Sequence, residues 1–128
     1  MTGKISILYD TIRLEEKLLI ESAKKNNISI DMIDCKKLFL DLNEKNCLDG
    51  PVLQRCVSYY RNLHSTAALE GQGAKVVNCL NTGIFAGNKL FTHMLLQKAG
   101  VPTPDATVAF SKDSALDALK KHGFPKII

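Results

Sequence analysis

The sequence lacks the cysteine spacings that mark zinc sites and disulfide frameworks. None of its four cysteines forms a CxxC pair, and no histidine lies beside them at ligand spacing. They are Cys35, Cys47, Cys56 and Cys79. We therefore expect reduced thiols, some of them packed in the core, and neither a metal site nor cross-links.

Long apolar runs, internal repeats and low-complexity segments are also lacking. No apolar run approaches membrane-spanning length, and Asp10, Arg13, Glu15 and Glu16 follow the first apolar segment too closely for a signal peptide. The 128 residues, 45% of them hydrophobic, suffice to bury the core of an ordinary domain. We infer a globular, cytoplasmic protein with no membrane partner.

The common phosphate-binding and phosphoacceptor patterns are absent as well. The chain contains neither GxGxxG nor GxxxxGK[ST], which disfavours dehydrogenases and P-loop enzymes. A phosphoacceptor receiver domain would group acidic residues after the first strand, whereas Asp10 stands alone and the third predicted strand ends in Arg55 and Cys56. The three histidines are separate and are expected on helix surfaces.

The net charge of +4 comes from 17 basic and 13 acidic residues. The basic residues are scattered and form no block, which favours a solvated mixed surface and predicts no nucleic-acid partner. A docking face for an acidic partner is the alternative.

What is present is an alternation of strand and helix patterns. Strands are predicted at residues 4–9, 28–34, 51–56 and 74–78. A helix over 13–26 is expected to bury Leu14, Leu18, Leu19 and Ala23, and Ser58 is expected to cap a second helix. Residues 38–50 indicate a mixed loop with some helix. Strands that alternate with helices predict an open parallel α/β sheet.

In open α/β sheets, ligands bind beyond the carboxyl ends of the strands. A polar set follows the four predicted strands there: Asp10, Thr11, Asp34, Arg55 to Ser58, and Asn78. These residues are therefore candidates for a site. The alternative is that each one caps a helix or makes a turn.

The pattern changes after Asn78. Residues 81–89 are predicted as a loop, followed by a helix over 89–100 that Gly100 ends. A strand over 106–110 and a helix over 112–122, capped by Ser111, come next. A last strand begins near Lys126, so we expect the start of a second domain, cut within its sheet.

Four segments resemble the start of an ATP-grasp ligase of the RimK-like group, and within it the LysX ligases of lysine biosynthesis. They are YDTIRLEEK (9–17), LQRCVSYYR (53–61), VVNCLNTGIFAGNKLFTHMLLQKAGVPTP (76–104) and HGFPKII (122–128). The third is shared widely among ATP-grasp enzymes, whereas the first two are more specific for LysX and its glutamate-using relative in arginine biosynthesis.

The resemblance implies a Rossmann-like pre-ATP-grasp domain over residues 1–86 and the beginning of an ATP-grasp domain over 87–128. ATP and Mg²⁺ are implied as ligands, with the metal ligands and the glycine-rich loop beyond Ile128. No catalytic residue is expected within the 128 residues. By the resemblance, we expect these residues to be an N-terminal fragment that is inactive alone.

The implied reaction is amide formation on an acidic amino-group carrier protein, LysW. ATP would phosphorylate the carboxylate of the carrier's C-terminal glutamate, and the amine of α-aminoadipate or glutamate would displace the phosphate. The sequence does not choose between the two amino acids. The intact enzyme is expected to be a homo-oligomer.

The resemblance also implies roles for four residues. Lys89 matches a lysine that reaches the phosphates of ATP, although Asn88 stands where the family usually has aspartate, and Ala86-Gly87 replaces its small residue-Cys-Gly step. Arg55, Ser58 and Asn78 match positions facing the interdomain cleft and are candidate substrate-binding residues, with structural roles as the alternative.

Two other functions remain open. One is a free-standing α/β binding or interaction module without catalysis. The other is a RimK-like ligase that adds glutamate to a ribosomal protein. A coding sequence that continued into a Lys-Pro step, a glycine-rich loop and acidic metal ligands would favour the ligases.

Overall fold

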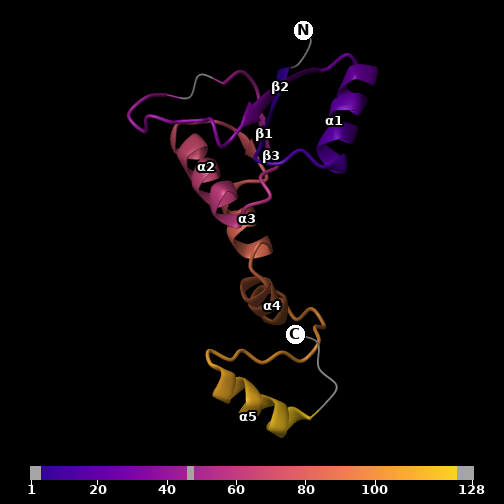
Figure 1. Ribbon diagram of the computed structural model, residues 1–128, viewed down its shortest axis with the longest axis vertical. Helices are drawn as coiled ribbons and strands as arrows, with labels where there is room; N and C mark the ends of the chain where they lie inside the picture. The colour runs from indigo at the N-terminus through magenta and orange to yellow at the C-terminus, as the bar shows by residue number, and fades with distance from the viewer. Residues whose placement is uncertain (1–3, 46–47, 124–128) are drawn as a thin grey trace. The chain divides into compact units, whose positions relative to one another are not determined.

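The computed structural model describes residues 4–45 and 48–123. The chain divides into two compact units, the first ending at Asn88 and the second starting at Lys89 (Figure 1). No helix in the described ranges is long and apolar enough to cross a membrane. The strand predicted to begin near Lys126 lies outside the described residues.

The first unit begins with the predicted strand, helix and strand. β1 (Lys4–Tyr9) leads through α1 (Leu14–Lys25) to β2 (Ser29–Asp34), and the two strands pair in parallel along their whole lengths. β1 is a central strand, and the adjacent side chains of Ile7 and Leu8, which point to opposite faces of the sheet, are almost completely buried. Burial on both faces explains why apolar residues follow one another here without alternation.

The second half of the sheet contains two shorter strands. β3 (Val52–Gln54) is followed by α2 (Tyr59–Gly71) and then by β4 (Val76–Val77). Both strands are shorter than the predicted ranges of 51–56 and 74–78, because the parallel ladder covers only these residues. The strand order is β2-β1-β3-β4, and all pairs are parallel.

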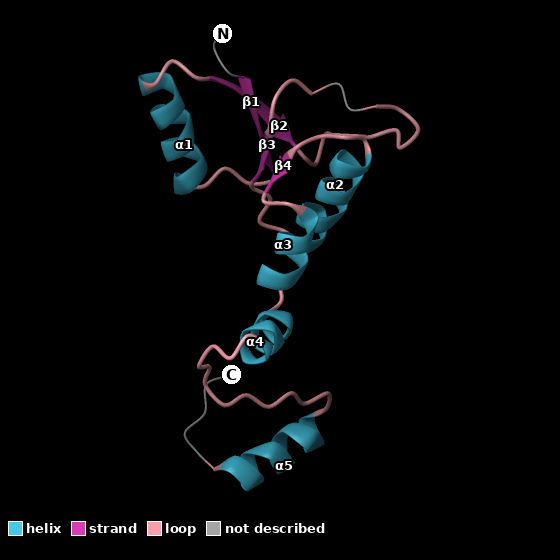
Figure 2. Ribbon diagram, turned by 180° about the vertical axis from the view of Figure 1, so that it is seen from behind, coloured by secondary structure: helices cyan, strands magenta, loops and turns pink. Residues whose placement is uncertain are grey.

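The helices α1 and α2 lie on opposite faces of the sheet (Figure 2). The crossover from β1 to β2 runs along the sheet in one direction, and the crossover from β3 to β4 runs in the other. Right-handed crossovers of opposite direction place their helices on opposite faces. The predicted open parallel α/β sheet is therefore confirmed.

The buried face of α1 differs from the predicted one. Leu14 and Leu18 are 68% and 53% exposed, whereas Glu16 and Ala23 are buried. The inward face follows Glu16 and Ala23, with Leu19 partly buried between them. The prediction is confirmed for Ala23 and wrong for Leu14 and Leu18, because it used hydrophobicity alone, whereas Glu16 is buried with ion pairs to Arg13 and Arg55.

The core of the first unit lies between the sheet and α2. Its buried members are Leu8, Val52, Cys56, Leu69, Ala74 and Val76. Burial raises the pKa of the Cys56 thiol, and the neighbouring thiol of Cys35 raises it further. Cys35, Cys56 and Cys79 are free thiols in the structure, and Cys47 lies outside the described residues.

Ser6 is a buried polar residue of β1 whose hydroxyl has no hydrogen-bond partner in the described part of the chain. Ser6→Ala is therefore expected to raise the free energy of unfolding by about 1 kcal/mol, because an unsatisfied hydroxyl is removed from the interior. Urea denaturation measures this. Ser29→Ala, at an exposed position of β2, should change little, and a loss of stability in Ser6→Ala would contradict the prediction.

Two connecting segments differ from prediction. Residues 81–89, predicted as a loop, mostly lie in α3 (Leu80–Ala86), which packs against α2. Gly83 permits this packing, since a Cβ there would come 3.1 Å from Leu63. In contrast, the described residues between 38 and 50 are mostly irregular, with a turn at 42–43 and no helix.

The second unit contains the two predicted helices, α4 (Lys89–Lys98) and α5 (Lys112–His122). Gly100, at a φ of 71°, follows the end of α4, and the Ser111 side chain accepts a hydrogen bond from the Ser114 amide at 3.1 Å. The helix over 112–122 has the predicted bounds, whereas the helix predicted over 89–100 starts at Lys89 and ends at Lys98. The predicted strand over 106–110 is wrong, because no strand in the described part of this unit pairs with it.

Candidate functional site

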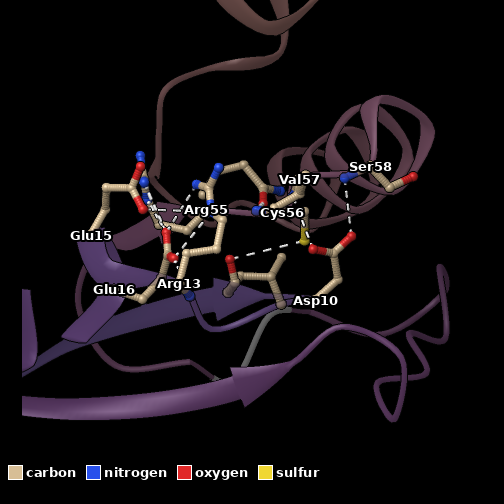
Figure 3. Close-up of polar contacts among 10 residues, drawn as sticks. Asp10, Arg13, Glu15, Glu16, Arg55, Cys56, Val57 and Ser58 are labelled. Atoms are coloured by element: carbon tan, nitrogen blue, oxygen red, sulfur yellow. Dashed lines mark hydrogen bonds and ion pairs between the residues drawn. The ribbon is translucent and has the colours of Figure 1, made fainter.

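The candidate site lies at the carboxyl ends of β1 and β3. These strands are neighbours, and their crossovers leave in opposite directions, so the sheet has its topological switch point between them. Figure 3 shows the polar residues that gather there. They come from the turn after β1, the first turn of α1 and the segment between β3 and α2.

Asp10 connects the end of β1 to the start of α2. Its carboxylate, which is 2% exposed, accepts hydrogen bonds from the Val57 amide at 2.9 Å and the Ser58 amide at 3.1 Å. Arg61 donates a third bond at 3.4 Å. Burial raises the pKa of Asp10, but these bonds together lower it below its usual value. Asp10 is thus held as a carboxylate.

Glu16 is the second buried carboxylate and lies between two arginines (Figure 3). Its Oε1 accepts from Arg55 Nη2 at 2.8 Å and Nε at 2.9 Å, and from Arg13 Nη2 at 3.3 Å. Its Oε2 also caps α1 by accepting from the Arg13 amide at 2.9 Å. Burial raises the pKa of Glu16, but the hydrogen bonds from Arg13 and Arg55 outweigh it and lower the pKa to about 2.

Ser58 and Asn78, the other predicted substrate residues, lie in different surroundings. Ser58 caps α2, since its hydroxyl accepts from the Arg61 amide at 3.4 Å. Asn78 is exposed and lines a cavity of about 370 Å³ at the ends of β3 and β4. Polar but uncharged side chains, among them Asn62 and Thr82, also line this cavity. Arg55 and Ser58 therefore lie in one polar cluster, and Asn78 lies beside the cavity.

Lys89 belongs to the second unit, where it is the first residue of α4. It is exposed, and no acidic residue lies in the first turn of this helix. A helix N-terminus favours negative charge, so a lysine there is suited to an anion that both the helix and the side chain attract.

The described residues form no metal centre. The described residues contain no group of three or more His, Cys, Asp or Glu side chains that could hold a metal ion. The resemblance places the ligands of Mg²⁺ beyond Ile128, so the described residues do not test it.

Sequence reasoning selected Asp10 and Arg55 but missed Glu16, Arg13 and Arg61 as members of the cluster. One signal was available. Only three of the 17 basic residues are arginines, and all three bond to Asp10 or Glu16. A planar guanidinium suits bidentate pairing with a carboxylate in a way that lysine does not.

The fold and this cluster define an open parallel α/β domain with a polar edge at its topological switch point. The family model of the LysX preATP-grasp domain matches residues 5–84. The chain belongs to this family.

Curated relatives extend the similarity beyond the matched domain. A glutamate–LysW ligase, ArgX, of Sulfolobus acidocaldarius is 32% identical over 124 residues, covering 97% of this chain and 44% of the relative. An α-aminoadipate–LysW ligase, LysX, of Sulfurisphaera tokodaii is 34% identical over 128 residues, with 97% and 45% covered. The chain spans less than half the length of these relatives.

A solved structure confirms the fold. A RimK domain ATP-grasp protein from Sphaerobacter thermophilus superposes with a TM-score of 0.80 at 25% identity. The match covers 96% of this chain and 48% of that one. The predicted resemblance to RimK-like ATP-grasp ligases and to LysX is confirmed.

Proposed function

We propose that the protein containing this sequence is an ATP-dependent carboxylate–amine ligase. It joins α-aminoadipate or glutamate to the C-terminal glutamate of a LysW-type carrier, in lysine or arginine biosynthesis in the cytoplasm. The observation that carries the proposal is the match of residues 5–84 to the LysX family. Its relatives include one named as a glutamate–LysW ligase and one named as an α-aminoadipate–LysW ligase. We also propose that the intact protein forms a homo-oligomer.

Lys89 is proposed to contact the phosphates of ATP. The support is its exposed position at the start of α4, with no acidic residue in the first turn. ATP, when bound, supplies the phosphoryl group that turns a carboxylate into a reactive acyl donor. The domain assignment follows from the same proposal, with residues 1–86 as the pre-ATP-grasp domain and 87–128 as part of the ATP-binding domain.

Arg55, Ser58 and Asn78 are proposed to face the substrates. Arg55 is 30% exposed at the carboxyl end of β3 and has a guanidinium suited to a carboxylate. Ser58 follows Arg55 by three residues in the same unit, and Asn78 presents an amide to the cavity at the ends of β3 and β4. An acidic carrier is attracted to a chain of net charge +4. This attraction raises the association rate of the two proteins more than it raises their affinity.

The test is amide formation by the full gene product with ATP, Mg²⁺ and a purified LysW-type carrier. Each amino acid is supplied in turn, and mass spectrometry follows the mass of the carrier. We expect a mass increase equal to one amino-acid residue with α-aminoadipate or with glutamate. No increase with either one, for a protein that is folded, would contradict the ligase and favour a binding module. Modification of a ribosomal protein instead would identify the RimK-like alternative.

Lys89→Gln is expected to weaken ATP binding by the same gene product about tenfold, because one charge-assisted phosphate contact is lost. Calorimetric titration with ATP and Mg²⁺ measures the dissociation constant. Lys98→Gln removes the same charge from the last turn of α4 and serves as the matched control. Equal effects of the two substitutions would show that Lys89 contributes general charge and no specific contact.

A further inference from the structure

The guanidinium groups of Arg13 and Arg55 converge on one atom. Arg55 Nη2 lies 2.8 Å and Arg13 Nη2 lies 3.3 Å from the same Oε1 of Glu16. Glu16 is fully buried and has a strongly lowered pKa, so it is ionised at neutral pH. The three groups together carry one excess positive charge.

Both guanidiniums keep donors for another ligand. Arg55 uses Nε and Nη2 on Glu16, and Arg13 uses the same two nitrogens. Neither Nη1 has a hydrogen bond to the described part of the chain. The two side chains are 30% and 41% exposed, so these donors are accessible to solvent.

Glu15 lies at this positive edge. Its Oε2 is 3.7 Å from Arg13 Nε, and its side chain is 58% exposed. An exposed pair of this kind contributes little free energy and opens readily. Glu15 is therefore a weak internal competitor for the same positive charge (Figure 3).

We propose that Arg13 and Arg55 form a binding site for one carboxylate. Glu16 holds the two arginines from the buried side, and Glu15 competes with the bound carboxylate for their positive charge. The inference rests on the proposed function, since it assigns the site to a carboxylate of the acidic substrates. A carboxylate has two oxygens, which can accept from two guanidiniums held on a common atom. Its single negative charge matches the excess charge of the cluster.

The carboxylate can come from the free amino acid or from the acidic end of the carrier. NMR detection of the arginine Nε–Hε signals tests both sources on the 128-residue chain. The probes are L-glutamate and a short glutamate-rich peptide, each compared with sodium chloride and inorganic phosphate at equal ionic strength. Arg61, which bonds to Asp10, is an internal reference.

We expect saturable shifts of the Arg13 and Arg55 signals, a smaller change at Arg61, and none of these with chloride. The probe with the lower dissociation constant identifies the source of the carboxylate. If neither probe shifts the two signals, or if phosphate or chloride shifts them equally, the carboxylate site is wrong.

Matched variants separate displacement of Glu15 from a general effect of charge. Glu15→Gln and Glu21→Gln remove the same charge from α1, but Glu21 is exposed and forms no ion pair with the described residues. Glu15→Gln is expected to tighten carboxylate binding about threefold relative to Glu21→Gln, because an exposed pair no longer competes. Equal affinities would contradict the role of Glu15.

Arg13→Gln is expected to weaken binding about tenfold while the chain stays folded, because a charge-assisted contact is lost. Unchanged affinity in this variant would overturn the site. These measurements need no catalysis. Absence of carboxylate binding would thus contradict the proposed site without contradicting the ligase function. Absence of ligase activity would contradict the ligase function, and a measured carboxylate site would remain.

Discussion

Gly50→Ala is expected to lower the free energy of unfolding by about 3 kcal/mol or more. Gly50 precedes β3 with a φ of 79°, in the left-handed region that favours glycine. A Cβ at this position would also overlap the backbone carbonyl oxygen of Lys4, at the start of β1. That oxygen cannot move easily, because the Ser6 amide bonds the Pro51 carbonyl at 3.0 Å and ties the two segments together.

Gly73→Ala is the matched control for this substitution. Gly73 has a similar φ of 89°, but no atom lies within 4 Å of a Cβ placed there. Its expected cost is about 1 kcal/mol, from backbone conformation alone. Urea denaturation of both variants measures the difference, and equal losses would show that the overlap with Lys4 relaxes at little cost.

Glu16→Gln is expected to lower the free energy of unfolding by about 2 to 3 kcal/mol at neutral pH. The substitution keeps the size of a fully buried side chain but removes the charge that Arg13 and Arg55 share. The loss is smaller than for a completely buried pair, because both arginines are partly exposed and regain water. Glu21→Gln on the same helix should change stability by less than about 0.5 kcal/mol, as expected for an exposed residue.

The same ion pairs predict a pH dependence. The folded pKa of Glu16 is about 2, below its ordinary value of 4.5. A lowered folded pKa stabilises the fold above the unfolded pKa, and this stabilisation is lost as the pH falls from about 5 towards 2. The wild-type chain should therefore lose about 2 to 3 kcal/mol more than Glu16→Gln across this range. Parallel stability profiles of the two proteins would contradict the role assigned to Glu16.

Most of the secondary structure followed from local patterns. The apolar residues of β1 and the alternation of β2 were sufficient to locate both strands. Ser58 and Ser111 marked the starts of α2 and α5, because a cap is a hydrogen bond between near neighbours in the chain. Such interactions depend on residues close in sequence, so the sequence is enough to predict them.

The candidate site was predictable in part. Polar residues after parallel strands must share one edge, which brought Asp10, Arg55 and Ser58 together as expected. The burial of Glu16 was not predictable, since a glutamate in the first turn of a helix is also typical of an exposed position. Its partner Arg55 lies 39 residues away, and only the pairing of β1 with β3 brings the two together.

The amino-acid sequence by itself determined the alternation of strands and helices from β1 to β4, the parallel α/β class, and the motifs that place the chain among RimK-like ATP-grasp proteins. The tertiary structure decided which face of α1 is buried, that residues 80–86 form a helix against α2, and that 106–110 form no strand. These outcomes depend on contacts between distant segments. Packing and strand pairing stabilise them, and local propensity does not reveal them.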